Sequence, residues 1–110
     1  MRGASAAALR RERVEFRGVV QGVGFRAMVV EIACRRPVAG WVRNEPDGSV
    51  RMVVEGGPGD VDALIETIRH RRGSDLEEVR REIIPAGSLN GGASGLLEGF
   101  RIKLNPRPDR

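Results

Sequence analysis

The sequence predicts an α+β domain built as a two-layer sandwich, in which an antiparallel sheet carries two helices on one face. Two observations favour this fold class. The length of 110 residues suits one hydrophobic core and is too short for two. Apolar residues recur with strand and helix periods in the order β-α-β-β-α-β, and a short fifth strand follows.

The first strand and the first helix flank a glycine-containing segment. Alternating side-chain character predicts a strand from Arg13 to Val20. After the glycines, apolar residues recur at offsets of 0, 4, 7 and 8 from Phe25, which lines one face of a helix running to about Arg36. Pro37 ends this helix, because proline disfavours the α conformation in the residue before it.

A β-hairpin follows in the middle of the chain. Its strands are expected in VAGWVRN (38–44) and SVRMVVEG (49–56), joined by a tight turn in EPDG. Pro46 suits the second position of a type I turn and Asp47 the third. Gly48 then supplies the left-handed residue that closes a hairpin with a bulge.

The second helix is predicted to begin in GGPGDVDAL. Asp60 or Asp62 lies near its N-terminus, where the helix dipole favours acidic groups. Cations, including the single histidine His70, gather at the other end, where a solvated or dipole-capping role is expected. The apolar stripe that faces the core consists of Val61, Leu64, Ile65 and Ile68.

The last third of the sequence is less regular. We expect a fourth strand within Leu76–Ile84, a mobile glycine-rich loop over 86–99 and a closing strand in FRIKL. The complete order is a split pair of β-α-β units, so the predicted fold is a ferredoxin-like sandwich. The domain is expected to span 12–105, between a disordered tail at 1–11 and a C-terminal tail at 106–110.

Composition limits the classes of function. The net charge is +4 and arginine supplies 18 of the 19 cationic side chains, which suits an anionic ligand without choosing between nucleic acid, a phosphorylated metabolite and mere solubility. Cys34 is the only cysteine, which excludes an intrachain disulfide and a metal site of paired cysteines. We expect this thiol to be partly buried. No apolar run reaches the length of a membrane span, and a cytoplasmic location is expected.

The segment VVQGVGFR (residues 19–26) is a candidate anion site. Gly22 and Gly24 permit positive φ angles, so successive N–H groups before a helix can converge on an oxyanion. Arg26 in the first helical turn could add a planar fork of donors. The alternative is that the glycines only turn the chain and Arg26 is solvated. A dinucleotide fingerprint and a Walker loop are excluded, because the third glycine of one and the GK[ST] of the other are missing.

The motifs GVVQGVGFR and GWVRNEPDGSV together resemble those of the acylphosphatase family, as does the spacing of thirteen residues between FR and GWV. The resemblance is strong over residues 13 to 57 and weaker afterwards. Read from the residues alone, Asn44 at the end of the second strand is a turn residue that hydrogen-bonds its own backbone. The resemblance gives it a different role.

The family likeness implies metal-free hydrolysis of the carboxyl-phosphate bond of acyl phosphates, with no cofactor. By motif, Arg26 matches the phosphate-binding arginine and Asn44 the asparagine that positions water. The backbone of the loop directly before Arg26 would cradle the phosphate oxygens with its N–H groups, through Gln21, Gly22, Val23, Gly24 and Phe25. The expected partners are a small acyl phosphate and inorganic phosphate, with no membrane or nucleic acid, and the expected state is a monomer.

Some residues depart from the family pattern, and other functions stay open. Arg36, Pro37 and Val38 replace a glycine between two leucines, and Gly73-Ser74 replaces a Gly-Pro pair. A non-catalytic phosphate-binding or RNA-binding module is one alternative, although the strands lack the aromatic pair on which RNA bases stack. A domain that handles carbamoyl phosphate, like that of hydrogenase maturation factors, is another; the missing zinc-finger and transferase portions disfavour it.

Overall fold

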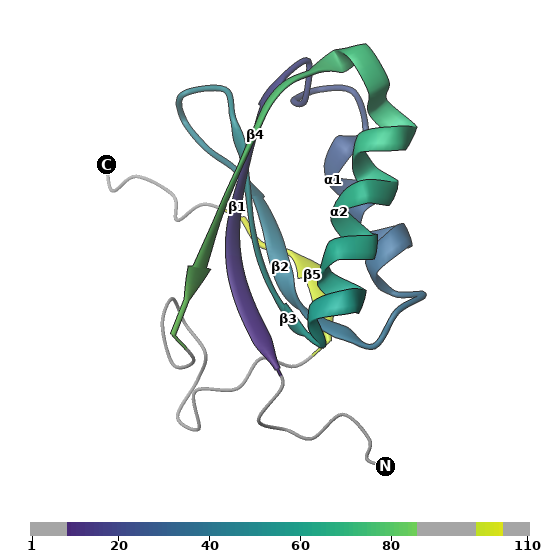
Figure 1. Cartoon of the computed structure of the whole chain (residues 1–110). Coiled ribbons are helices and arrows are strands. Elements are labelled where there is room, and N and C mark those ends of the chain that lie inside the picture. The colour runs from purple at the N-terminus through teal and green to yellow at the C-terminus, as the bar shows by residue number, and fades with distance from the viewer. Residues whose placement is uncertain (1–8, 86–98, 105–110) are drawn as a thin grey trace, which may run out of the picture.

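The computed structural model describes residues 9–85 and 99–104, and Figure 1 shows their arrangement. The elements confirm the predicted order, with a short 3₁₀ turn, η2, after the second helix. In chain order they are β1 (Arg10–Gly18), α1 (Phe25–Ala33), β2 (Val38–Asn44), β3 (Val50–Gly56), α2 (Pro58–Arg72), η2 (Gly73–Asp75), β4 (Leu76–Ile84) and β5 (Phe100–Ile102).

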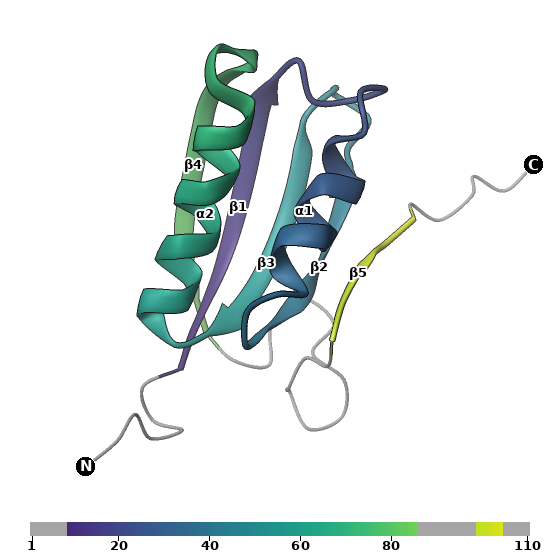
Figure 2. The same ribbon diagram turned by 90° about the vertical axis from the view of Figure 1, so that its right-hand side faces the viewer.

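The five strands form one sheet in the order β4-β1-β3-β2-β5. Both helices cover the same face of this sheet, as Figure 2 shows, and the prediction of a ferredoxin-like sandwich is confirmed. One detail of that prediction is wrong. The pairs β1–β3, β1–β4 and β2–β3 are antiparallel, but β5 pairs parallel to β2, so the sheet is mixed.

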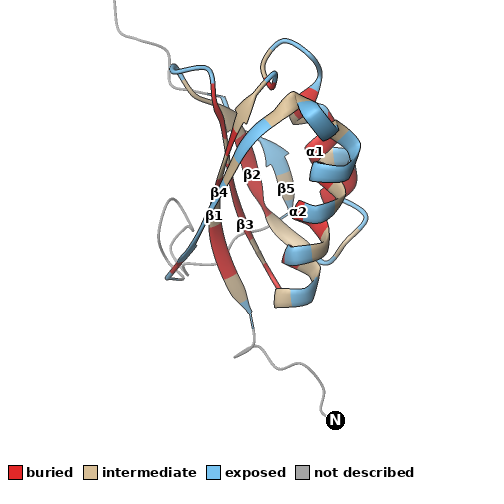
Figure 3. Ribbon diagram, turned by 45° about the horizontal axis from the view of Figure 1, so that its top comes forward, coloured by how far each residue is buried: buried red, intermediate tan, exposed pale blue. Residues whose placement is uncertain are grey.

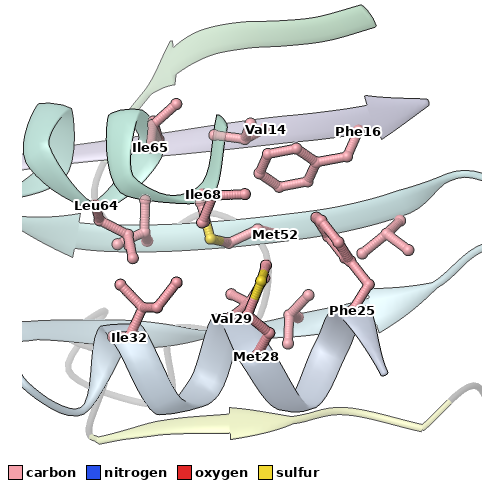
Figure 4. Close-up of a cluster of buried hydrophobic side chains, with 14 of the residues drawn as sticks. Val14, Phe16, Phe25, Met28, Val29, Ile32, Met52, Leu64, Ile65 and Ile68 are labelled. Atoms are coloured by element: carbon pink, nitrogen blue, oxygen red, sulfur yellow. The ribbon is translucent and has the colours of Figure 1, made fainter. Parts of the chain in front are cut away.

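The hydrophobic core lies between the sheet and the two helices (Figure 4). The predicted stripe of α2 is buried there, together with the apolar face of α1 and the inward residues of β1 and β3. Phe16 of β1 and Phe25 of α1 meet edge-on within it, with ring centroids 5.1 Å apart. Full burial of such a side chain contributes about 1.5–3 kcal/mol. The largest apolar side chains that are fully buried in this core are Phe16, Phe25, Met52, Leu64, Ile65 and Ile68.

The opposite face of the sheet carries few apolar residues. Val53, whose neighbours along β3 both join the main core, points to this face and packs in a second cluster with Trp41 and Ile84. The expectation that Trp41 packs is confirmed, since this residue is 3% exposed. Arg43 and Lys103 cover that ring, with charged groups 4.9 and 4.6 Å from its centroid. Figure 3 shows the buried interior against the more exposed helix surfaces.

The first strand begins three residues earlier than predicted and ends two residues earlier. Arg11 and Glu12, both charged, are 3% and 2% exposed within β1. Arg11 lies 2.6 Å from Glu55, and Glu12 accepts hydrogen bonds of 2.9 and 2.8 Å from Arg81. Burial of charges is tolerated when they are paired in this way. Strand β1 therefore includes Arg10 and Arg11, which the sequence analysis had assigned to the tail.

The first helix ends at Ala33 rather than near Arg36. The N–H groups of Arg35 and Arg36 bond to carbonyls three residues back, Ile32 at 3.2 Å and Ala33 at 3.0 Å, which tightens the last turn. Cys34 at this turn is exposed, so the expected partial burial is wrong. The predicted loop at 86–99 falls almost wholly outside the described residues.

Two glycines are needed for packing. A Cβ on Gly40 would lie 1.9 Å from the carbonyl oxygen of Val53, and a Cβ on Gly18 would lie 2.1 Å from that of Asp75. A residue with a side chain would fit at neither position unless the backbone moved. Neither helix in the described part of the chain is long and apolar enough to span a membrane.

Candidate active site

The two segments singled out from the sequence meet at one end of the sheet. Strands β1 and β2 are both antiparallel to β3, which lies between them, so their C-terminal ends point the same way. Phe16 and Asn44 both pair with Val50, so they stand in one row across the sheet. The loop that leaves β1 and the hairpin that follows β2 consequently lie together, at the top of Figures 1 and 2.

The glycines of the loop differ from those used in packing. Gly22 and Gly24 have φ angles of 76° and 78°, the left-handed values that glycine adopts at no steric cost. Nothing lies within 4 Å of the place where a Cβ would stand on either residue. The space beside this backbone is therefore open, and a ligand could approach the N–H groups closely.

Helix α1 starts directly after this loop, with an unblocked N-terminus. Gly24 is the N-cap and offers no side-chain hydrogen bond, and the first turn contains no acidic residue. The first intrahelical bond runs from the N–H of Met28 to the carbonyl of Gly24, at 3.1 Å. The preceding N–H groups of the first turn have no acceptor within the helix, and they lie at the positive end of its dipole. Such an end attracts anions.

Arg26 adds a full positive charge to this end of the helix. It is the second residue of α1 and its side chain is partly exposed. Many other arginines in the described part of the chain are ion-paired, for example Arg17 of β1 with Glu15 at 3.0 Å. Within residues 9–85 and 99–104, Arg26 makes no ion pair. A cation beside a helix N-terminus is unfavourable without a counter-charge, so this site favours an anion.

Asn44 is the last residue of β2 and is partly buried. The predicted turn that follows it is confirmed, since the N–H of Gly48 donates to the carbonyl of Glu45 at 3.1 Å and Gly48 has a φ of 94°. Asp47 accepts from the N–H and the hydroxyl of Ser49, at 3.0 and 2.7 Å. These two bonds, the hydroxyl first, and the weaker effect of Arg17 together lower the pKa of Asp47 to about 2. The hairpin tip beside Asn44 is thus firmly held.

One contact at this end of the sheet was missed by the sequence analysis, which assigned Gln21 only a backbone role. Its side-chain nitrogen Nε2 donates to the carbonyls of Glu45 and Ser49, at 2.9 and 2.8 Å. The acceptors lie 24 and 28 residues further along the chain, so no local pattern in the sequence points to them. The loop before α1 and the hairpin after β2 are joined through this carboxamide.

The structure brings the predicted site residues to one end of the sheet, and the side chain of one of them points away from any ligand there. Phe25 is 1% exposed and its ring lies in the core, so only its N–H group can face a ligand. The whole predicted set is Gln21, Gly22, Val23, Gly24, Phe25, Arg26 and Asn44.

A hollow of about 660 Å³ lies away from this end, lined by Arg13, Glu15, Arg51, Arg80, Arg81 and Glu82. Many of its charges neutralise one another, for example Arg13 with Glu82 and Arg80 with Glu15. Mutual pairing reduces the attraction of this hollow for an external ion. It is therefore a weaker candidate for an anion site than the open N-terminus of α1.

Comparison with known proteins identifies the family. The family model Acylphosphatase matches residues 12–85. The chain is 41% identical to an acylphosphatase of Thermococcus kodakarensis over 96 residues, which cover 86% of this chain and 98% of that protein.

Solved structures agree with this assignment. The crystal structure of acylphosphatase from Bacillus subtilis superposes with a TM-score of 0.72 at 30% identity, over 86% of this chain and 98% of that one. The T. kodakarensis HypF structure gives a TM-score of 0.70 at 28% identity over 86% of this chain, but only 12% of the HypF chain. The chain described here therefore belongs to the acylphosphatase family of enzymes.

Proposed function

We propose that this chain hydrolyses the carboxyl-phosphate bond of acyl phosphates without a metal ion, giving a carboxylate and inorganic phosphate. The observation that carries the proposal is Arg26, which stands without an ion pair in the described structure at the open N-terminus of α1. Asn44 is the last residue of β2, and the turn after it is hydrogen-bonded to Gln21 in the loop before α1. An anion site and a carboxamide are thus brought together at the same end of the sheet.

The phosphoryl group binds first. Its oxygens accept hydrogen bonds from the N–H groups of Gly22 to Phe25 and from the guanidinium of Arg26. A planar arginine fork matches a phosphoryl group, and fixed donors stabilise charge as it develops in the transition state. The open space beside Gly22 and Gly24 admits the oxygens close to the backbone.

Water then attacks in line with the acyl oxygen. The Asn44 carboxamide accepts a hydrogen bond from this water and orients it. A bond forms between the water oxygen and phosphorus, while the bond from phosphorus to the acyl oxygen breaks and its electron pair leaves with the carboxylate. The water proton passes to a phosphate oxygen. A carboxylate is a good leaving group, so positioning and charge stabilisation suffice.

The test is the release of inorganic phosphate from acetyl phosphate by the purified chain in the presence of EDTA. We expect turnover that EDTA leaves unchanged, with inorganic phosphate as a competitive inhibitor. No turnover, or turnover only after a divalent metal is added, would contradict the proposal.

A second candidate, which comes from the resemblance of the sequence to part of the hydrogenase maturation factors, is the handling of carbamoyl phosphate. A comparison of kcat/KM for acetyl and carbamoyl phosphate separates the two substrates. A preference for carbamoyl phosphate by tenfold or more would support this second candidate.

RNA binding is less well supported. Base stacking needs exposed aromatic rings. Trp41 is covered by Arg43 and Lys103, and Phe16 and Phe25 lie in the core. Phe100 is partly buried against that core. The described part of the chain therefore offers no pair of exposed rings on the sheet.

A further inference from the structure

The side chain of Gln21 links the two halves of the candidate site. Its single amide nitrogen carries two hydrogens, and both are used, at 2.9 Å to the carbonyl of Glu45 and 2.8 Å to that of Ser49. Glu45 directly follows Asn44, and Ser49 closes the same turn. The carboxamide is partly buried, so these bonds are sheltered from exchange with water.

The acceptors form a rigid pair. The N–H of Glu45 donates to the carbonyl of Ser49 at 2.9 Å, so the two residues are already fixed to each other. Because the side-chain nitrogen of Gln21 donates to both carbonyls, both its position and its orientation are fixed. The loop that begins at Gln21 thereby takes its position from the hairpin that carries Asn44.

A second side-chain link between these regions is weaker. Arg17, at the end of β1, donates to Asp47 at 3.0 Å, but the arginine is 38% exposed and the aspartate 52%. Exposed ion pairs contribute little to stability. The Arg17–Asp47 pair connects the strand end and not the glycine loop, so it does not fix the backbone N–H groups that precede Arg26.

We infer that Gln21 is a positioning residue, which holds the phosphate loop and Asn44 in one frame. The inference rests on the proposed function. In-line attack requires the water on Asn44 to face the phosphorus held by the loop, and a misplacement of about 1 Å can cost about a hundredfold in rate. Gln21 acts through the loop and the hairpin, and its side chain need not touch the substrate.

The decisive variant is Gln21→Met, which keeps the length of the side chain and removes both donors. We expect kcat to fall between about tenfold and a hundredfold, because the water loses its alignment. The inhibition constant of inorganic phosphate should change less than twofold, because Arg26 and the loop N–H groups remain. Arg17→Gln is the matched control, which removes only the exposed link and should leave kcat within about twofold of wild type.

Two results of this experiment would overturn the inference. Wild-type kcat in folded Gln21→Met would show that the link is unnecessary. A loss of phosphate affinity as large as the loss of kcat would show that Gln21 acts on binding instead.

A second measurement does not depend on activity. In the wild-type chain, NMR should show slow hydrogen exchange for the Gln21 side-chain amide, and inorganic phosphate should shift backbone resonances in both the loop and residues 44–49. Fast exchange of that amide would overturn the inference even if the variant failed to fold. An inactive wild-type chain that still showed the slow amide and the coupled shifts would reject the hydrolase proposal and keep the link.

Discussion

The ring of Phe25 meets that of Phe16 edge-on, at 5.1 Å between centroids and an interplanar angle of 63°. Phe25 directly precedes Arg26, so the first turn of α1 is fixed by a hydrophobic contact beneath the site. Edge-to-face pairs add about 0.5–1.5 kcal/mol beyond burial. The polar residues above this contact can therefore be replaced without loss of the helix.

Arg26→Ala should lower the rate of acyl phosphate hydrolysis by about a hundredfold to a thousandfold, because a fixed donor to the phosphoryl oxygens is lost. Circular dichroism and Tm should stay close to wild type. Arg35→Ala is the control, since Arg35 lies just beyond the other end of α1, is 77% exposed and, among the described residues, pairs only with Glu31. Activity of Arg26→Ala equal to that of the control would remove Arg26 from the mechanism.

Asn44→Ala should reduce kcat by a similar factor while inorganic phosphate still binds. In the proposed mechanism the carboxamide orients water, whereas the phosphate donors lie on the loop before α1 and in the first turn of that helix. Steady-state kinetics with phosphate as inhibitor separates the two effects. A double variant, Arg26→Ala with Asn44→Ala, that still turned over acyl phosphate at a substantial rate would refute the assignment of both residues.

Gly40→Ala should destabilise the fold by about 3 kcal/mol or more, because its new Cβ would stand 1.9 Å from the carbonyl oxygen of Val53. Gly59→Ala, in the first turn of α2, is the matched substitution, and nothing lies within 4 Å of its new Cβ. It should stabilise the fold by about 0.4–1 kcal/mol. Urea unfolding of the two variants measures both effects, and equal stabilities would contradict the packing argument.

Asp47 should contribute to acid stability in a defined pH window. Its pKa falls from 3.8 to about 2 on folding, through the bonds from Ser49 and then the pairing with Arg17. A depressed carboxyl pKa stabilises the folded state above about pH 4 and loses that effect as the pH falls towards 2. Asp47→Asn keeps an acceptor oxygen but should show a smaller drop in Tm between pH 4 and pH 2. NMR titration of the wild-type carboxyl near pH 4 would contradict this.

Local sequence signals predicted the elements that depend on neighbouring residues. The turn at Pro46, Asp47 and Gly48 was predicted because each residue suits one backbone conformation, and the structure has that turn. The apolar stripe of α2 was also predicted from local sequence, because helix periodicity alone puts its residues on one face of the helix. The β4 bounds Leu76–Ile84 also match, although its charged pattern is irregular.

Features that depend on distant partners could not be predicted. The start of β1 was missed because Arg11 and Glu12 read as exposed residues, while their partners Glu55 and Arg81 lie far along the chain. The parallel pairing of β5 is set by how the chain returns to the sheet edge, which side-chain periodicity does not encode.

The residues alone and the family resemblance predicted different parts of the candidate site. The glycines and Arg26 indicated an anion site but left simple turn formation open. The role of Asn44 came from the family resemblance, because an asparagine before a turn has an ordinary structural explanation. The carboxamide bonds of Gln21 join loops that only the fold brings together.

The position of β3 between β1 and β2 also affects how the chain gains activity as it folds. The β2–β3 hairpin can form early from neighbouring residues, but the β1–β3 ladder joins segments well separated in the chain and forms more slowly. Asn44 is in place after the hairpin forms, and the loop before α1 (residues 21–24) only after the β1–β3 ladder forms. During refolding, the recovery of activity should therefore report formation of the whole central sheet. Molecules in which only the β2–β3 hairpin has formed should be inactive.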